Sequence, residues 1–413
     1  MFKVRRKLYD NGNKENSLAL TIDGQENTSL INLLTSDEST PVNTATNTIS
    51  SVTPTPSATN TFTSTSATSR TVEESPTNQP VVSLKRCWKK KKEDFYFFTG
   101  VTQQNFTALY NLLGGDEVIS KLKMEYKLST PDKNENKFKL PLKDRLFLTL
   151  IRLRRGIPLR DLAEVMGIGK TQASEIFYAM IRHMYLTFQI FKERMLPTVE
   201  QQQKNKPKVF RPFKNLRLII DGAEFRLQRP TDFQQQGNTY SEYKGGNTAH
   251  FIIGINLQGG VAFVSKAYEG SISDKQAVVK SELLEMLSPG DALMVDRGFD
   301  LKAECTLKNI SLIRPPSLSK NQTMTPKEIV LTKAIAKARI YVEHIIKNIK
   351  QYRLLRYTIP NKMIPYLEDL VYVCAFLINF NPPNVIKDGR KRKKTFKSPV
   401  KKRAARKNIS KDS

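Results

Sequence analysis

The sequence is short of cysteine, of acidic residues and of long apolar runs, and each shortage excludes a class of protein. Three cysteines in 413 residues cannot build a disulfide framework, and no two of them have the CxxC spacing of a zinc or redox site. No stretch of 18 or more apolar residues occurs, so we expect no membrane span. The first residues, Met1 to Lys7, lack the apolar core of a signal peptide. We therefore expect an intracellular protein.

Positive charge, by contrast, is in large excess. The chain carries 67 Lys and Arg against 39 Asp and Glu, a formal net charge of +28. Nucleic acid is the commonest partner of so basic a protein. Residues 387–413 alone hold 13 Lys or Arg and two Asp. Their clusters at 390–394 and 401–403 are typical of nuclear import signals or phosphate-binding arms, with a solubilising tail as the alternative. We expect a location in the nucleus.

Composition divides the chain into four segments. Ser and Thr make up 19 of the 34 residues from 39 to 72, and such a segment cannot bury enough apolar surface to fold. We therefore predict a disordered Ser/Thr-rich leader over 1–84. The like charges of 386–413 repel one another and predict a disordered basic tail. Between these lie a predicted helical domain, 85–200, and a predicted α/β domain, 201–385.

Helical periodicity and glycine turns predict a helix-turn-helix over about 141–185. Pro141 precedes a helix that Gly156 ends, and a short second helix leads to a turn at Gly167–Gly169. Many three-helix bundles with this pattern bind no DNA. Four arginines beside it favour DNA contact: Arg152, Arg154, Arg155 and Arg160. The third helix would present residues suited to a major groove at its start: Lys170, Thr171, Gln172 and Ser174.

Short apolar runs then predict a sheet. We expect a strand over 216–220 that ends on Asp221, and another over 292–295 that ends on Asp296. Two further runs, 250–256 and 261–265, predict a hairpin around a glycine turn. Helical patterns follow at 275–287, 327–352 and 367–380. Strands followed by alternating helix and strand predict an α/β domain.

Three carboxylates are candidates for chemistry. An ionised Asp at the end of a buried strand is costly unless it is paired or binds metal, and Mg²⁺ prefers carboxylate oxygens. Asp221 and Asp296 fit this description, although either one alone could simply cap a turn. Glu343 lies on the basic helix and shares a face with cations at helical spacing: Arg339, Lys347 and Lys350. That face is either a salt-bridged surface or a metal site that also holds a phosphate backbone.

Several ordered blocks resemble the DDE transposases of the PIF/Harbinger superfamily. Besides the helix-turn-helix they are FYFFTG (95–100), IDGAEF (220–225), YSEYKGGNT (240–248), GSISD (270–274), VDRGFD (295–300), ARIYVE (338–343) and the final VCAFLINF (373–380). The resemblance covers most of 94–386. It implies an RNase H-like catalytic domain, with a mixed sheet flanked by helices, preceded by an all-α helix-turn-helix domain.

The resemblance also implies roles for individual residues. Asp221, Asp296 and Glu343 match the family's catalytic triad, which binds two Mg²⁺ or Mn²⁺ ions. Arg339 and Lys350 match basic residues around the family's Glu, whereas Ala336 stands where bacterial relatives have Tyr.

Two blocks add residues around that triad. Lys244, in the YSEYKGGNT block, is expected to hold DNA phosphate together with Arg339, Lys347 and Lys350. Asp274 ends the GSISD block, and we expect it to be an accessory residue that organises the fold.

The implied activity is that of a DNA transposase. Such an enzyme cleaves phosphodiester bonds at transposon ends and joins the freed 3′-OH to target DNA. Its partners would be double-stranded DNA, a second copy in a homodimer, and a Myb-like DNA-binding protein. The alternative is a domesticated, catalytically silent, transposase-derived nuclear DNA-binding or adaptor protein. A transcription factor unrelated to transposition would leave the two strand-end aspartates unexplained.

Overall fold

The computed structural model describes residues 83–89, 92–122, 140–204, 206–316 and 323–381. The predicted leader lies outside these residues except for its last two positions, and the predicted basic tail lies outside them entirely. Among the described residues, no helix is both long enough and apolar enough to cross a membrane.

The described chain begins with helices. They are α2 (Leu84–Trp88), α3 (Lys92–Thr99), α4 (Gln103–Leu112), α5 (Gly115–Lys121), α6 (Leu142–Arg155), α7 (Leu159–Val165), α8 (Lys170–Gln189) and α9 (Val199–Lys204). The predicted helix-turn-helix is confirmed in α6, α7 and α8. Gly156 ends α6 in the left-handed conformation, with φ of 67°. Helix α8 runs past the predicted end at residue 185, because Phe188 continues its buried face.

The rest of the chain forms a mixed sheet with helices on both sides. The strands are β1 (Leu216–Arg226), β2 (Tyr240–Ser241), β3 (Gly246–Ile255), β4 (Val261–Val264), β5 (Tyr268–Glu269), β6 (Ala292–Met294) and β7 (Ser311–Ile313). Their order is β2-β3-β1-β6-β7, and β4 and β5 also pair with β3. β1 is antiparallel to β3 and parallel to β6. The predicted fold class is confirmed, as is the predicted hairpin, formed by β3 and β4.

One strand boundary differs from the sequence prediction. β1 does not end at Asp221 but continues to Arg226, and all of it from Ile219 onward pairs with β3. The reason is that Ala223 and Phe225 keep the alternation of buried residues beyond Asp221. Asp221 therefore lies inside a strand, whereas Asp296 follows the end of β6 as predicted.

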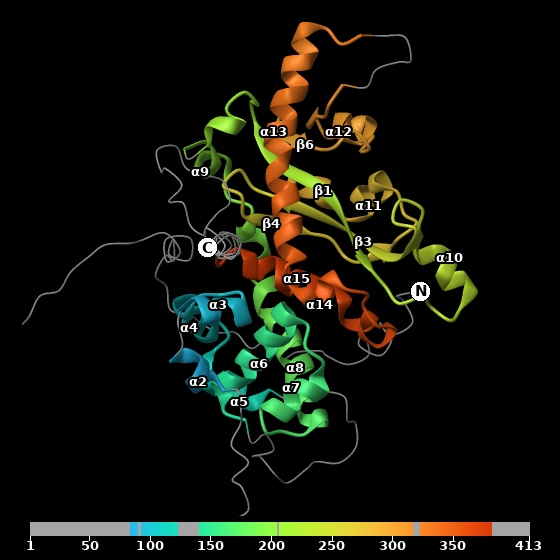
Figure 1. The fold of residues 1–413 in the computed structure, drawn as a ribbon. Coiled ribbons are helices and arrows are strands. Elements are labelled where there is room, and N and C mark those ends of the chain that lie inside the picture. Colours follow the sequence, from blue (N-terminus) through green and yellow to red (C-terminus); the bar gives the residue numbers. More distant parts are fainter. Residues whose placement is uncertain (1–82, 90–91, 123–139, 205, 317–322, 382–413) are drawn as a thin grey trace, which may run out of the picture. The chain divides into compact units, whose positions relative to one another are not determined.

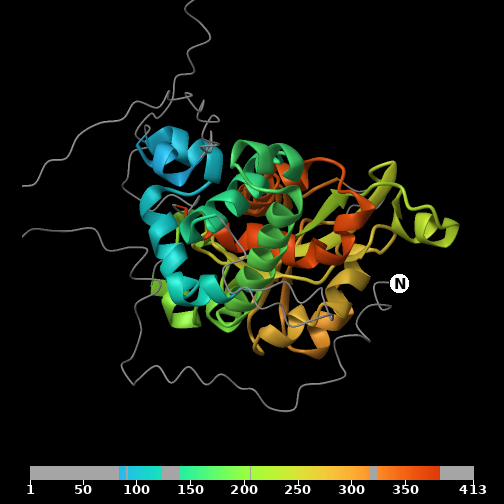
Figure 2. The same ribbon diagram turned by 90° about the horizontal axis from the view of Figure 1, so that it is seen from below.

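The helices of this part are α10 (Phe233–Thr239), α11 (Asp274–Lys280), α12 (Lys302–Leu307), α13 (Pro326–Ile349), α14 (Arg353–Arg356) and α15 (Leu367–Ile378). The predicted helix over 275–287 is interrupted, because Glu282 has a φ of 58° and a short 3-10 turn, Leu283–Met286, follows it. α10 extends away from the sheet in both Figure 1 and Figure 2.

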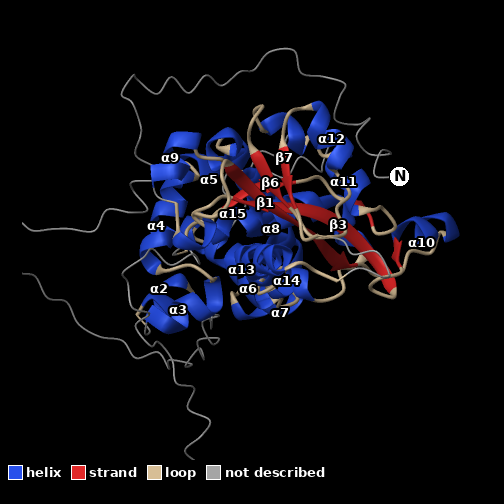
Figure 3. Cartoon of the chain, turned by 90° about the horizontal axis from the view of Figure 1, so that it is seen from above, coloured by secondary structure: helices blue, strands red, loops and turns tan. Residues whose placement is uncertain are grey.

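Two clusters of buried side chains cover the two faces of the sheet. α11 and α12 pack on one face with Leu218 and Ile220 of β1. α13 and α15 pack on the other, with Ile219 and Ala223. Figure 3 shows these helices on opposite sides of the strands. The second cluster continues without a break into α3, α6 and α8, so the helical part and the sheet share one core.

Candidate functional site

The sheet brings the two aspartates to equivalent positions. In the parallel pair of β1 and β6, Ile219 pairs with Met294. Asp221 and Asp296 each follow this registered pair by two residues. Two residues along a strand return a side chain to the same face. The strand register therefore places the two carboxylates side by side on the face covered by α13.

Helix α13 brings the third carboxylate to the same place. It packs against β1 and β3 through its buried face, which includes Ala338, Val342 and Ile345. Arg339 also lies on the buried side, with 11% of its side chain exposed, whereas the side chain of Glu343 is 53% exposed. The helical spacing of four residues puts Arg339 and Glu343 one above the other.

The guanidinium group of Arg339 contacts all three carboxylates. Its Nη1 donates to Oδ1 of Asp296 at 2.7 Å. Its Nη2 lies 3.7 Å from Oδ2 of Asp221 and 3.9 Å from Oε1 of Glu343. Its Nε has no hydrogen-bond partner among the described residues. The three carboxylates thus converge on a single cation, which is supplied by the chain itself.

The electrostatics of Asp221 show that this cation does not offset the full cost of the buried charge. Burial raises the pKa of Asp221 to about 6, against the opposing effects of Arg339 and of the N–H of Gly222. Asp296 and Glu343 raise this pKa further. A carboxyl group that holds its proton more tightly than usual indicates a site that would accept additional positive charge.

The donor set fits a hard divalent cation. All three side chains offer carboxylate oxygens, which Mg²⁺ and Mn²⁺ prefer. In the conformation described, the guanidinium lies among the three carboxylates. Among the described residues no three carboxylate, histidine or cysteine side chains are grouped so that they could hold a metal ion. In this conformation Arg339 is the cation that the three carboxylates contact.

One of the predicted phosphate-binding lysines, Lys350, lies near Asp221, and a second, Lys244, lies near Lys350. Burial lowers the pKa of Lys350, and Lys244 lowers it further, while Glu224 and Asp221 raise it. These interactions place Lys350 near both Lys244 and Asp221. Lys350 also lies over the ring of Phe225, with Nζ 5.5 Å from the ring centroid. Lys347 is exposed on α13, one turn beyond Glu343.

Asp274 lies on the opposite face of β1 from Asp221, Asp296 and Glu343. It begins α11, and its Oδ1 is 3.3 Å from Nε2 of His250, a buried residue of β3. A Cβ on Gly222 would lie 2.8 Å from Oδ1 of Asp274. Because neighbouring side chains of a strand point to opposite faces, Asp274 and Asp221 lie on opposite sides of β1. The pair of Asp274 and His250 therefore lies against the face of β1 opposite to Asp221.

His250 was not among the residues predicted from the sequence. Its signal was available, since it is one of only three histidines and lies within an otherwise apolar run. A buried polar residue requires a partner. Asp274, the last residue of the GSISD block, was the candidate for that partner.

The predicted groove-facing residues share the first turns of α8. Lys170 and Thr171 are exposed there, and Gln172 and Ser174 are half-buried. Gly169 precedes the helix as its N-cap. Of the four arginines nearby, Arg152 has a structural role. Its guanidinium donates to the carbonyl oxygens of Gly156 and Ile157.

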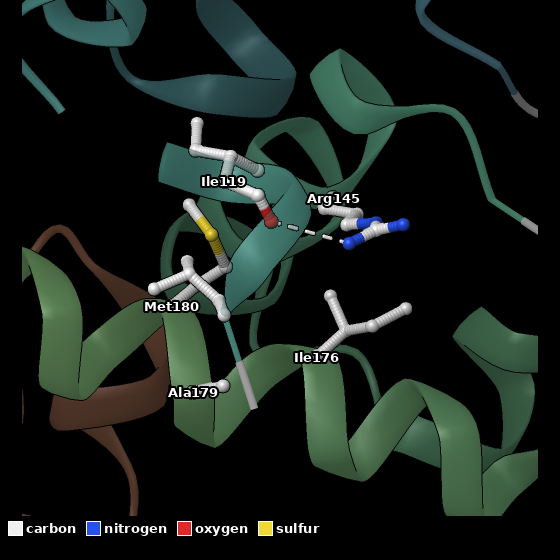
Figure 4. A pocket seen from close by; sticks show the side chains of 6 residues that line it. Ile119, Arg145, Ile176, Ala179 and Met180 are labelled. Carbon is white, nitrogen blue, oxygen red and sulfur yellow. Dashed lines mark hydrogen bonds between the residues drawn. The ribbon is translucent and has the colours of Figure 1, made fainter. Parts of the chain in front are cut away.

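A cavity in the helical part is too small to be a ligand site. Figure 4 shows it between α5, α6 and α8, and its volume of about 10 Å³ leaves room for one water at most. Its walls are apolar except for Arg145, whose Nη1 donates to the carbonyl oxygen of Ile119 at 3.2 Å. The carboxylate site on β1, β6 and α13 remains the candidate.

Comparisons with known protein families agree with both regions. Residues 220–379 match the family model described as DDE superfamily endonuclease. Residues 138–190 match the model described as helix-turn-helix of DDE superfamily endonuclease. The first range contains Asp221, Asp296 and Glu343, and the second contains α6, α7 and α8. No curated protein and no solved structure matches the chain.

Proposed function

Because the chain belongs to the DDE superfamily of transposase endonucleases, we propose that it cleaves phosphodiester bonds at transposon ends and joins the 3′-OH to target DNA. One observation carries this proposal. Asp221, Asp296 and Glu343 come from three elements far apart in the sequence and converge on one cation, the guanidinium of Arg339. A set of three buried or half-buried carboxylates is costly to assemble unless positive charge is to be held there.

In this proposal, the same three carboxylates would hold two Mg²⁺ or Mn²⁺ ions. When bound, such ions make water a stronger nucleophile and neutralise charge on a leaving oxygen. Asp221 must lose its proton to act as a ligand, and its pKa of about 6 places that loss just below neutral pH. Asp274 is proposed as an accessory residue that holds β1 in position through His250.

The basic side chains near the carboxylates are proposed to hold DNA. Lys244, Lys347 and Lys350 would contact phosphates as point charges. Arg339 would contact only a phosphate that reaches the carboxylates, because its guanidinium lies among them. In the helix-turn-helix, the first turns of α8 would enter a major groove through Lys170, Thr171, Gln172 and Ser174.

The remaining parts of the proposal concern partners and location. Double-stranded DNA is the proposed substrate. A homodimer would bring two DNA ends together, and a Myb-like protein would contribute to recognition of those ends. The basic clusters at 390–394 and 401–403, which lie outside the described residues, would direct the protein to the nucleus.

One observation favours the second candidate, a catalytically silent DNA-binding protein. In the conformation described, a side chain of the protein itself, Arg339, supplies the cation that the three carboxylates share. The two candidates differ in a single respect, which is whether divalent metal enters the site.

Nicking of supercoiled plasmid in Mg²⁺ or Mn²⁺ separates the two candidates. We expect the purified chain to nick the plasmid, and we expect Asp221→Asn, Asp296→Asn and Glu343→Gln each to lower the rate at least about 100-fold while DNA binding persists. Asp300→Asn is the matched control, because this exposed carboxylate pairs with Arg314 outside the site. Full nicking activity in any triad variant would overturn the assignment, and absence of nicking by the wild type would favour the silent protein.

A further inference from the structure

Three arginines gather where the end of α6 meets the start of α14. Arg154 and Arg155 are the last two residues of α6, and Arg353 is the first residue of α14. Gly156 permits this approach, because a Cβ at that position would lie 3.2 Å from Cβ of Arg353. We call Arg154, Arg155 and Arg353 the arginine surface.

Aromatic rings hold two of these guanidinium groups in place. The guanidinium carbon of Arg155 lies 3.8 Å from the ring centroid of Phe97. That of Arg154 lies 5.6 Å from the rings of both Tyr96 and Tyr352. A guanidinium held on an aromatic ring keeps its planar array of donors in a fixed orientation. It therefore loses little conformational entropy when it binds a ligand.

The charges of the arginine surface are not neutralised within the described part of the chain. No Asp or Glu that the structure describes forms an ion pair with any of the three arginines. Burial lowers the pKa of Arg155, and Arg353 and Arg154 lower it further. Like charges collected in this way repel one another in the free protein, and a polyanion would relieve that repulsion.

Two further cations lie along the chain between the carboxylate site and the arginine surface. Lys347 and Lys350 follow Glu343 on α13, and Lys350 lies about 10 Å along the helix from Glu343 at the usual rise per residue. Arg353 comes three residues later, at the start of α14. α14 packs against α6, the first helix of the helix-turn-helix. Arg353 thus begins an element that follows α13 along the chain and packs on the helix-turn-helix, the two regions that the proposed function assigns to DNA.

We propose that the arginine surface binds the phosphate backbone of double-stranded DNA, between the bond that is cleaved and the segment held by the helix-turn-helix. This inference rests on the proposed function. Phosphate is favoured over the carboxylates of an acidic protein because the three arginines lie on α6 and α14, which belong to or adjoin the two regions that the proposed function assigns to DNA. Fixed guanidinium groups also suit the bidentate contacts that phosphate accepts.

Duplex affinity measured without metal tests the inference. The full chain is titrated against a fluorescent duplex of random sequence in EDTA, at several salt concentrations. We expect Arg155→Gln with Arg353→Gln to weaken binding about tenfold and to reduce the slope of log K against log salt by about 2, one for each lost phosphate contact. The matched control is Lys280→Gln with Lys302→Gln, which removes the same charge from exposed positions on α11 and α12. We expect it to change the slope far less.

Several outcomes would overturn the inference. An unchanged slope in the arginine variant would do so, as would an equal loss in the lysine control. Loss of binding to fluorescent poly-glutamate with duplex binding intact would show instead that the surface takes an acidic protein.

If the Gln variant fails to fold, Arg155→Lys with Arg353→Lys replaces it. That variant should keep the salt slope and still lose affinity, because lysine lacks the planar fork. Binding in EDTA is independent of cleavage, so a chain without nuclease activity would still give a result.

Discussion

At the scale of single residues, the candidate site depends on what lies on each side of β1. The three carboxylates and Arg339 meet on one side, and Asp274 and His250 meet on the other. Gly222 separates the two groups. Because it has no side chain, Asp274 can approach the strand directly beside Asp221.

Gly222→Ala is expected to disturb both sides of the strand. The added Cβ would lie 2.8 Å from Oδ1 of Asp274 and 3.1 Å from Cε1 of His250, so one of these side chains must shift. We expect a loss of about 1–3 kcal/mol in the free energy of unfolding, as for other overpacked sites. Nicking activity should fall as well, because Asp221 is the adjacent residue. Denaturant melts and plasmid nicking measure the two effects.

Gly237→Ala is the control for this substitution. Gly237 lies in α10, and a Cβ there would have nothing within 4 Å. We expect it to be neutral or to stabilise the helix by up to about 1 kcal/mol. Equal effects from the two substitutions would show that Gly222 has no special role.

The sequence identifies the three carboxylates better than it identifies their surroundings. Asp221 and Asp296 are conspicuous because each interrupts or ends an apolar run. Arg339 is not, because a basic residue four positions from Glu343 fits an exposed salt bridge equally well. Its burial follows from how α13 rests on the sheet, which is a tertiary property. Arg152 likewise fits a DNA contact in sequence but is used to hold the turn after α6.

At the scale of elements, α13 is the critical one, since it carries both Arg339 and Glu343. Its last turns pack on the sheet, and its first turns extend beyond the sheet (Figure 1). Ile329, Val330 and Leu331 are exposed there. A helix end without packing depends on local interactions. Here a capping box supplies them, with Thr325 and Glu328 bonded reciprocally.

Thr325→Ala is expected to loosen this end of α13. The substitution removes the hydroxyl that accepts from the N–H of Glu328, and the usual cost is about 1 kcal/mol. Because the first turns have few tertiary contacts, amide exchange in 326–332 should accelerate about fivefold while exchange near Glu343 stays unchanged. Thr358→Ala, in an exposed segment, is the control. Equal acceleration along all of α13 would contradict a purely local role for the cap.

The elements themselves were largely predictable from periodicity. α6, α7 and the β3–β4 hairpin follow their sequence signals closely. β1 was predicted too short, because Asp221 and Gly222 resemble the end of a strand. Pairing with β3 along the whole segment overrides that local signal. The predicted helix over 275–287 was longer than α11, since no sequence rule anticipates the left-handed conformation of Glu282.

At the scale of the whole molecule, the helix-turn-helix and the sheet are joined through α8 and α15. The rings of Phe188 and Phe376 stack with centroids 4.0 Å apart. Beside them, Nη1 of Arg182 lies 3.3 Å from both carboxylate oxygens of Asp369. The helix-turn-helix is therefore packed directly against the domain that carries the carboxylates. The sequence predicted two separate domains and contained no sign of this shared core.

Asp369 gives that junction a pH dependence. Burial raises its pKa from 3.8 to about 6, although Arg182 opposes the rise. The folded chain thus binds this proton more tightly than the unfolded chain does. The resulting stabilisation is present at acidic pH and is lost as the pH rises from about 4 to about 6. In Asp369→Asn, the fall in unfolding free energy over this pH range should be smaller by up to about 3 kcal/mol.

Denaturant melts of the metal-free chain between pH 4 and pH 8 test this expectation. As the pH rises from 4 to 8, the unfolding free energy of the wild type should fall relative to that of Asp369→Asn. Asp94→Asn, an exposed carboxylate on α3, should leave the wild-type profile unchanged. A parallel pair of profiles for wild type and Asp369→Asn would refute the assignment.

Asp221, Asp296 and Glu343 are proposed to surround one divalent-metal site. Iron-mediated cleavage of the polypeptide tests it most directly, because Fe²⁺ with ascorbate generates radicals that cut the chain beside the bound ion. Mass spectrometry of the fragments should locate cuts near residues 221, 296 and 343, and excess Mg²⁺ or the Asp296→Asn substitution should suppress all three together. Cuts elsewhere in the chain, or an unchanged pattern in Asp296→Asn, would contradict the claim.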